Sequence, residues 1–226
     1  MVLTMSTVAI KTMSFYRTSV GKKTVMAVTG LLMLLFVMMH MLGNLQVFAG
    51  PEKMNAYAAF LRGLPGPLWA FRGLMGLALV LHVVTALLLI AQSLRSRPVR
   101  YKRRSYQEAT TSSRTMLLTG PLILAYLVYH LLDQTFGVVN PAFNHLDVYR
   151  NVIVGFSDLR VSVGYIAAML LLMLHLKHGI WSLFQTLGLN IPRYDASIRA
   201  VSVLLAVGLA AGYISIPAAV LAGWLR

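Results

Sequence analysis

Five long apolar stretches, separated by polar and basic segments, dominate the hydrophobic pattern of this 226-residue chain. They lie near residues 24–47, 68–94, 115–137, 160–187 and 199–225. A helix needs about 20 apolar residues to cross the hydrocarbon core of a bilayer. In lipid, a helix is also the open-chain structure that satisfies its own backbone hydrogen bonds. The pattern therefore predicts an all-α membrane protein with five transmembrane helices in a single membrane domain, residues 1–226.

The connections predict two further elements. Pro51 opens the segment PEKMNAYAAFLRGL, which is typical of a short amphipathic helix, and Asn140-Pro141 begins a second segment that reaches Ser157. Both are expected at the outer surface, as interfacial helices or caps over the bundle. Pro217, late in the fifth stretch, is expected to kink that helix. The first stretch is too long for the apolar region of a signal peptide, so we interpret it as a retained helix.

The positive charges are unevenly divided between the two ends of the predicted bundle. Thirteen Lys and Arg residues precede the first span or lie in the second and fourth connections, against six on the other side. This bias predicts a multi-pass protein of the cytoplasmic (inner) membrane with a cytoplasmic N-terminus. The net charge of +14 then reflects topology, and no nucleic-acid partner is expected. The basic second connection either contacts anionic lipid or docks a cytoplasmic partner, and both interpretations stay open.

Composition excludes several kinds of chemistry. Charged residues make up 12% of the chain, about half the roughly 25% of a soluble domain. The chain has no cysteine, which excludes disulfides and Cys-ligated iron–sulfur clusters within it. Any redox chemistry must therefore depend on other ligands.

Five of the six histidines fall inside the predicted spans, and the sixth, His145, lies in an outer loop. Ionisable side chains within a membrane are costly and by default mark function, although a single neutral histidine can simply hydrogen-bond a neighbouring helix. Four successive spans contribute His40, His82, His130 and His175, spaced 42, 48 and 45 residues apart. The alternating topology places His40 and His130 toward the outside, and His82 and His175 deeper toward the cytoplasm.

Two neutral imidazoles that face each other are an axial ligand pair for a six-coordinate haem. Two such pairs predict two haems stacked across the membrane, held by four of the five helices. Zinc would need three or four ligands at one level, and the six acidic residues lie in loops or at span ends. Gly30 and Gly120, each ten residues before its span's histidine, would let a haem edge approach the backbone. Ordinary helix packing is the alternative role for either glycine.

The pattern resembles the diheme cytochrome b anchor subunit of bacterial succinate dehydrogenases and quinol:fumarate reductases (respiratory complex II). The resemblance covers nearly the whole chain and rests on MMHMLGN, VLHVVTA, VYHLLDQ and, most specifically, HLKHGIWSLFQTLG with its His-x-x-x-Gly-x-Trp-Ser frame. The frame implies that iron is bound by His175, four residues before Gly179, and not by His178. His178 would hydrogen-bond a haem propionate or merely pack.

The resemblance also implies how the cofactors and partners are arranged. His82 and His175 would hold an inner b-type haem, and His40 and His130 an outer one. A flavoprotein subunit and an iron–sulfur subunit would bind the cytoplasmic face and pass electrons from succinate through the haems to a membrane quinone. Menaquinone is the quinone expected, and the whole complex could form a higher oligomer. Some relatives have a glutamate two residues before the fourth ligand as part of a proton route, whereas this chain has Met173, so such a route is not expected.

Polar residues near the two haem levels supply further candidates. Arg17, Lys22 and Lys23 would lie beside the inner-haem propionates or a partner subunit, or simply form the positive flank of the first span. A quinone site needs polar groups among apolar walls. The outer candidates are Asn44, Gln46, Asp133, Gln134 and Arg62, and the inner ones are Ser19, Trp181 and Gln185. The outer site is favoured, although Asp133 could instead be a helix-end cap.

Two other classes of protein compete with this interpretation. One is the cytochrome b subunit of another membrane oxidoreductase, a hydrogenase or a formate dehydrogenase. The other is a cofactor-free transporter or anchor, but a transporter would be expected to contain helices broken at mid-membrane. The colour of the purified protein separates these classes, since only the first two contain haem.

Overall fold

The computed structural model describes residues 14–96 and 111–226, and all the regular elements it assigns there are helical. In chain order the elements are α2 (Ser19–Asn44), the 3-10 helix η1 (Leu45–Ala49), α3 (Pro51–Arg62), α4 (Pro65–Arg95), α5 (Thr111–Gln134), α6 (Val148–Ser157), α7 (Leu159–Thr186), the 3-10 helix η2 (Pro192–Tyr194) and α8 (Asp195–Leu221). The prediction of an all-α protein with five long apolar helices is confirmed. The two short helices predicted in the connections are also present, as α3 and α6.

Side-chain caps fix where several helices begin. The Thr18 side chain accepts a hydrogen bond from the Gly21 backbone N–H ahead of α2. Asp147 and Asp158 do the same for α6 and α7, with the first-turn residues Arg150 and Arg160 as donors. These caps satisfy backbone N–H groups that have no partner within the helix.

Two helices end earlier than the apolar pattern predicted. The predicted third span reached residue 137, but α5 ends at Gln134. Gly137 has a φ of +69°, and the Val138 N–H donates to the Leu132 carbonyl oxygen at 2.8 Å. This is the reversal that a left-handed glycine allows at a helix C-terminus. Similarly, α8 ends at Leu221, and Gly223 follows with a φ of +74°.

Two helices contain a proline beyond their first turn, and both continue past it. Pro217 lies inside α8, which continues to Leu221. Pro121, which the apolar pattern does not single out, lies inside α5 directly after Gly120. Because proline has no backbone N–H, the Leu117 carbonyl loses its usual helical partner at that turn.

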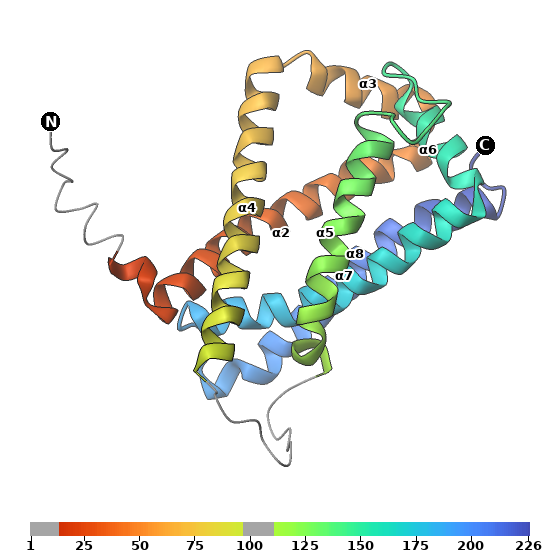
Figure 1. The fold of residues 1–226 in the computed structure, drawn as a ribbon. Coiled ribbons are helices and arrows are strands. Elements are labelled where there is room, and N and C mark those ends of the chain that lie inside the picture. The colour runs from red at the N-terminus through yellow and green to blue at the C-terminus, as the bar shows by residue number, and fades with distance from the viewer. Residues whose placement is uncertain (1–13, 97–110) are drawn as a thin grey trace, which may run out of the picture.

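The long helices pack in antiparallel pairs: α2 lies against α4, α5 against α7, and α7 against α8, while α2 also crosses α7 (Figure 1). The helices α3 and α6 lie together at one end of the bundle, near the C-terminus. We call this the α3–α6 end. The opposite end, where α4 ends and α5 begins, is called the basic end below.

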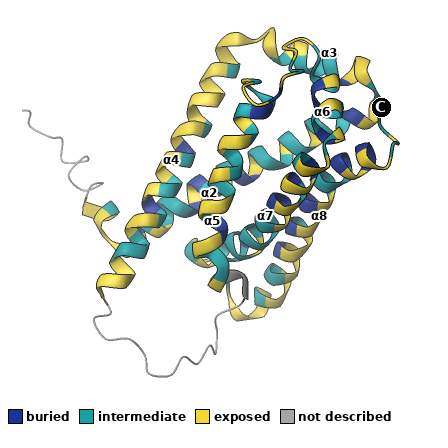
Figure 2. Cartoon of the chain, turned by 45° about the vertical axis from the view of Figure 1, so that its right-hand side comes forward, coloured by how far each residue is buried: buried dark blue, intermediate teal, exposed yellow. Residues whose placement is uncertain are grey.

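Buried hydrophobic side chains form two clusters, and both include residues of α7 and α8. One buried cluster, at the α3–α6 end, includes Val47, Phe156 and Tyr165, and a second joins Leu34, Ile180 and Leu209 from α2, α7 and α8. In contrast, α4 is exposed along most of its length (Figure 2). Large apolar side chains facing outward are unfavourable in water, but they suit contact with lipid chains.

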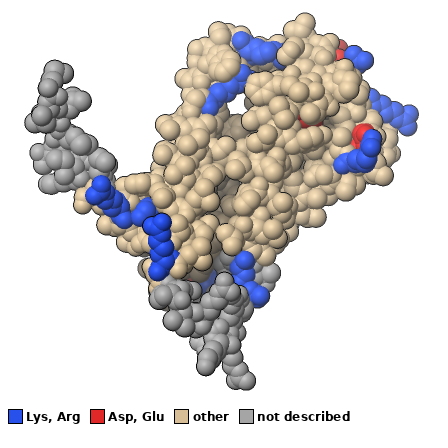
Figure 3. Space-filling view, viewed as in Figure 1, with Lys and Arg blue, Asp and Glu red and all other residues tan. Residues whose placement is uncertain are grey.

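Charged side chains avoid the middle of the visible surface. In the space-filling view, Lys and Arg lie at both ends, and the acidic side chains that are visible lie toward the α3–α6 end (Figure 3). The same view shows the surface hollowed between α4 and α5. On this face, the charge pattern leaves a broad middle band without charged side chains.

Candidate functional site

The first histidine pair joins α2 to α5. The ring centroids of His40 and His130 lie 5.9 Å apart with an interplanar angle of 82°. Aromatic rings enclose the pair, since Phe36 stacks on His40 and Tyr126 stacks on His130. The two predicted outer ligands, 90 residues apart in the sequence, therefore face each other in the bundle.

The spacing of this pair suits one shared metal ion. An imidazole nitrogen binds a first-row metal at about 2 Å, so two rings on opposite sides of one ion have centroids about 6 Å apart. The distance between His40 and His130 is 5.9 Å. Among the residues that the structure describes, no three or more His, Cys, Asp or Glu side chains converge on a common point. The residues present thus fit a two-ligand metal group such as haem better than a zinc site.

The second pair belongs to α4 and α7. It consists of His82 and His175, and each of these rings has a hydroxyl group beside it. Each ring contacts the long helix that comes before its own: His82 on α4 contacts α2, and His175 on α7 contacts α5. The His82 Nδ1 lies 3.2 Å from the Thr29 hydroxyl, and the His175 Nδ1 lies 3.3 Å from the Thr119 hydroxyl.

Glycine follows each of these threonines and lies beside the same histidine. A Cβ atom at Gly30 would lie 3.4 Å from His82 Cε1, and one at Gly120 would lie 4.0 Å from His175 Cε1. Both candidate glycines thus lie next to the predicted inner ligands. At Gly179, the third candidate, a Cβ would meet no atom within 4 Å.

His178 lies one turn further along α7 from His175. Its Nδ1 is buried and has no hydrogen-bond partner, and its ring centroid lies 6.1 Å from that of Trp181. An unsatisfied buried nitrogen costs free energy unless a partner is supplied. His178 Nδ1 is therefore able to take a further hydrogen-bond partner, as its predicted contact with a propionate requires.

The other inner candidates lie near the basic end. Lys22 donates to the Arg17 carbonyl oxygen at 2.9 Å and to the Gln92 side-chain oxygen at 3.3 Å, whereas Arg17 and Lys23 are exposed. Ser19 and Gln185 are also exposed. Lys22 thus links α2 to α4 in this structure.

Trp181 belongs to a polar network with the start of α8. Its indole N–H donates to Asp195 Oδ1 at 3.0 Å, and the Arg199 guanidinium lies 4.3 Å from its ring centroid. Arg199 also pairs with Asp195 at 2.6 Å. These contacts join α7 to α8. The indole N–H of Trp181, which the sequence suggested as a quinone contact, is bonded to Asp195 in this structure.

The outer quinone candidates divide into two groups. Asp133 and Gln134 lie at the end of α5, where the Gln134 amide donates to Asp133 at 2.8 Å. The other three candidates lie apart from this pair. Asn44 donates a hydrogen bond to the His40 carbonyl oxygen, and Arg62 donates one to the His145 carbonyl oxygen. Gln46 is half-buried and makes no side-chain hydrogen bond to the described residues. The structure therefore brings two of the five candidates beside the first histidine pair and gives Asn44 a bond within its own helix.

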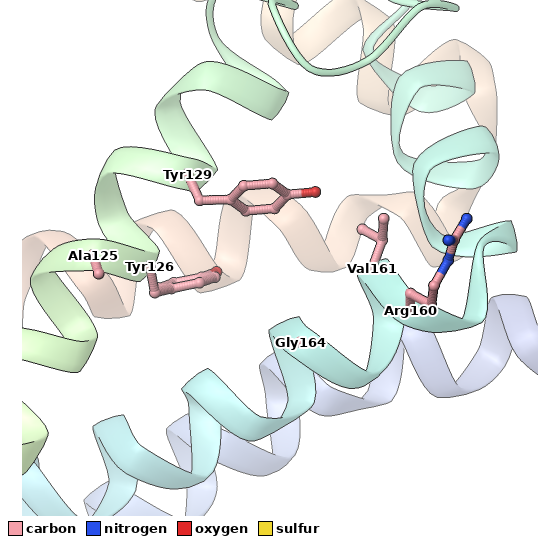
Figure 4. A pocket seen from close by; sticks show the side chains of 6 residues that line it. All are labelled: Ala125, Tyr126, Tyr129, Arg160, Val161 and Gly164. Atoms are coloured by element: carbon pink, nitrogen blue, oxygen red, sulfur yellow. The ribbon is translucent and has the colours of Figure 1, made fainter.

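A pocket of about 450 Å³ lies between α5 and α7 on the side of the first pair (Figure 4). Tyr126 and Tyr129 reach across it from α5, and Arg160, Val161 and Gly164 line it from α7. A second pocket, of about 330 Å³, lies between α2 and α4 and is lined by Thr24, Thr29 and apolar side chains. The first pocket combines apolar walls with phenolic hydroxyl groups.

Sequence reasoning missed the hydroxyl groups that contact the histidines. Thr29 and Thr119 touch the second pair, and the Tyr165 hydroxyl lies 3.4 Å from His130 Nδ1. A signal for the threonines was present in the sequence, because the dipeptide Thr-Gly occurs eleven residues before both His40 and His130. Nothing in the local sequence indicated Tyr165.

The protein is all-α. Within the described residues, five helices are long and apolar enough to cross a membrane. Comparison with protein-family models, with curated proteins and with solved structures finds no match to this chain.

Proposed function

We propose that this chain is a diheme cytochrome b that anchors a succinate:quinone oxidoreductase in the cytoplasmic membrane. The observation that carries the proposal is the approach of His40 to His130, whose ring centroids lie 5.9 Å apart in the interior of a helical bundle. The pair formed by His82 and His175, on the other two helices of the hairpins, supports a second site nearer the basic end.

In this proposal each histidine offers one ring nitrogen to a metal while the bundle keeps water away. Two b-type haems, when bound, would carry single electrons between the two sides of the membrane. His82 and His175 would hold the inner group, and His40 and His130 the outer group. The chain would then supply both protein ligands of each haem, which suits electron transfer rather than oxygen chemistry.

The basic end is the surface proposed to receive the soluble partners. The chain has no cysteine of its own, so electrons must come from an iron–sulfur subunit that carries clusters, and a flavoprotein subunit must oxidise succinate. The basic loop proposed to meet them lies outside the described residues. Lys22 and the unpartnered Nδ1 of His178 would meet the inner propionates.

A quinone is proposed to bind near the outer pair. The pocket lined by Tyr126, Tyr129 and Arg160 lies there, and the Asp133–Gln134 pair lies one turn beyond His130. The apolar walls would hold the isoprenoid tail, and the phenol and amide groups would bind the carbonyl oxygens.

Haem content per chain tests the proposal. Purified parent protein should contain two low-spin b-type haems, measured by the haemochrome assay against protein mass. We expect His40→Ala and His130→Ala to lose the outer haem, and His82→Ala and His175→Ala to lose the inner one. His145→Ala is the matched control, because that ring contacts Phe143 in a loop.

Two results would count against the proposal. A colourless parent protein would remove the haem assignment altogether. Loss of the inner haem in His178→Ala, together with its retention in His175→Ala, would reverse the ligand assignment on α7.

The choice of enzyme is tested separately. Membranes containing the complete complex should reduce quinone with succinate, and not with hydrogen or formate.

A further inference from the structure

Three of the four proposed ligands share a contact that the proposed function does not require. The Nδ1 of His82 faces the Thr29 hydroxyl at 3.2 Å, that of His175 faces Thr119 at 3.3 Å, and that of His130 faces Tyr165 at 3.4 Å. Thr29, Thr119 and Tyr165 are exposed by only 5%, 1% and 6%, so water does not compete for these hydroxyl groups.

The protons of two of these hydroxyl groups are already engaged elsewhere. Thr29 donates to the Val25 carbonyl oxygen at 2.7 Å, and Tyr165 donates to Asp133 Oδ2 at 2.7 Å. The oxygens of Thr29 and Tyr165 are thereby left as acceptors for the histidines. Thr119 lies 3.5 Å from the Met116 carbonyl oxygen and 3.3 Å from His175 Nδ1, and we give it the same role as Thr29.

An accepting hydroxyl oxygen selects one of the two imidazole tautomers. A neutral imidazole has one N–H donor and one acceptor nitrogen. If Nδ1 donates to a hydroxyl oxygen, Nε2 keeps its lone pair and is the nitrogen able to bind a metal. Such a contact also fixes the ring orientation and makes the ligand more basic.

We propose that Thr29, Thr119 and Tyr165 are positioning residues that hold His82, His175 and His130 as Nδ1–H tautomers with Nε2 directed to iron. The inference rests on the proposed function and adds a consequence. Both inner ligands, His82 and His175, contact a hydroxyl group, whereas in the outer pair only His130 does. Among the described residues, the ring of His40 has aromatic neighbours, Phe36 and Tyr213, and no hydrogen-bond partner.

The two threonines occupy equivalent positions in the two hairpins. Thr29 precedes Gly30 and Thr119 precedes Gly120, and each threonine touches the histidine of the next long helix in its hairpin. Equivalent contacts from two unrelated stretches of sequence are expected if the hydroxyl group has the same role in both.

The test compares Thr29→Val and Thr119→Val with Thr29→Ser and Thr119→Ser. Valine keeps the shape and removes the hydroxyl group, whereas serine keeps the hydroxyl group. Thr85→Val is the control, because Thr85 is fully buried on α4 but its hydroxyl group pairs with Tyr16. The readouts are haem content, the midpoint potential of each haem by redox titration, and the electron paramagnetic resonance spectrum of the oxidised protein.

We expect both valine variants to lose the inner haem or to shift its midpoint potential upward, since a less basic ligand stabilises the oxidised iron less. The outer haem, measured in the same sample, should be unchanged and reports that the protein has folded. The serine variants and Thr85→Val should match the parent in potential and spectrum.

The possible failures are distinguishable. A parent protein with two haems and valine variants with unchanged inner potential and spectrum would overturn this inference and leave the proposed function standing. Serine variants as defective as the valine variants would also overturn it, because packing rather than the hydroxyl group would then be the cause. A parent protein without haem would overturn both.

Discussion

Tyr165 on α7 donates a 2.7 Å hydrogen bond to the carboxylate of Asp133 on α5, and the two side chains are 6% and 3% exposed. Gln134 donates a second bond to the same oxygen at 2.8 Å. A carboxylate in such a place is tolerated because donors replace the water it has lost. This contact joins the two helices beside His130.

Removing the tyrosine hydroxyl group should therefore weaken the bundle. Tyr165→Phe leaves Asp133 with one fewer donor, and we expect the free energy of unfolding to fall by about 1–3 kcal/mol. Thermal unfolding of the detergent-solubilised protein, followed by circular dichroism, measures the change. Tyr129→Phe is the control because Tyr129 is 36% exposed. Equal stability of the two variants would contradict the structural role given to Tyr165.

Bulk at Gly30 should disturb the inner site. A Cβ there would lie 3.4 Å from His82 Cε1, so the two methyl groups in Gly30→Val would push the ring from its place. We expect the inner haem to be lost or its absorption spectrum to change. Gly120→Val should have a smaller effect, because its Cβ would lie 4.0 Å from His175 Cε1.

The matched control for this series is Gly76→Val on α4. A Cβ at Gly76 meets no atom within 4 Å, and both glycines lie inside long helices. If Gly76→Val were as damaging as Gly30→Val, the effect would come from the helix backbone and not from contact with His82.

The Asp147 carboxyl at the start of α6 bonds Asn55 on α3, and we expect the stability that this contact contributes to depend on pH. The Arg150 backbone N–H at 3.0 Å and the Asn55 side chain at 2.9 Å hold the pKa of the Asp147 carboxyl below its usual range. Because the folded pKa is lower than the unfolded value of about 3.9, the stabilisation is complete above that value and is lost as the pH falls through the folded pKa.

Comparison of the parent protein with Asp147→Asn between pH 7 and pH 3 measures this contribution. We expect a difference below about 1 kcal/mol at neutral pH, since the site is exposed, and it should shrink at the acid end. Asn55→Ala should reduce the pH dependence because one donor is removed. A stability difference that grew as the pH fell would contradict the argument.

The predicted orientation can be tested with introduced cysteines, since the natural chain has none. Leu146→Cys lies in the loop before α6, and Leu189→Cys lies between α7 and η2, where the native side chains are 76% and 56% exposed. A membrane-impermeant thiol reagent should label Leu146→Cys in intact spheroplasts and Leu189→Cys only after lysis. The opposite labelling would reverse the orientation.

Much of the fold could be predicted from the sequence, because a span must be long and apolar whatever its neighbours are. The pattern located the five long helices to within five residues at each end, and it also located α3. In the second connection, α6 begins at Val148, eight residues after the predicted start of that segment at Asn140. The ends of α5 and α8 were predicted too late, since apolar residues continue past the glycines that end those helices. Pro121 was overlooked because it lies in the middle of an apolar run.

The candidate site was only partly accessible to such reasoning. Histidines in four successive spans indicated pairs, but facing rings depend on the rotation and crossing of helices, which no single span specifies. The contact of Tyr165 with both His130 and Asp133 joins residues more than thirty positions apart. Similarly, Arg62 was offered to a quinone, whereas its partner in the fold is the His145 carbonyl oxygen.

By itself, the sequence determined the number and order of the long helices, because hydrophobic transfer and backbone satisfaction act on each segment separately. Tertiary structure alone decided which rings face each other and which hydroxyl group each Nδ1 meets. Those relationships depend on side-chain packing between helices, where a rotation of one helix by a single residue would separate His40 from His130.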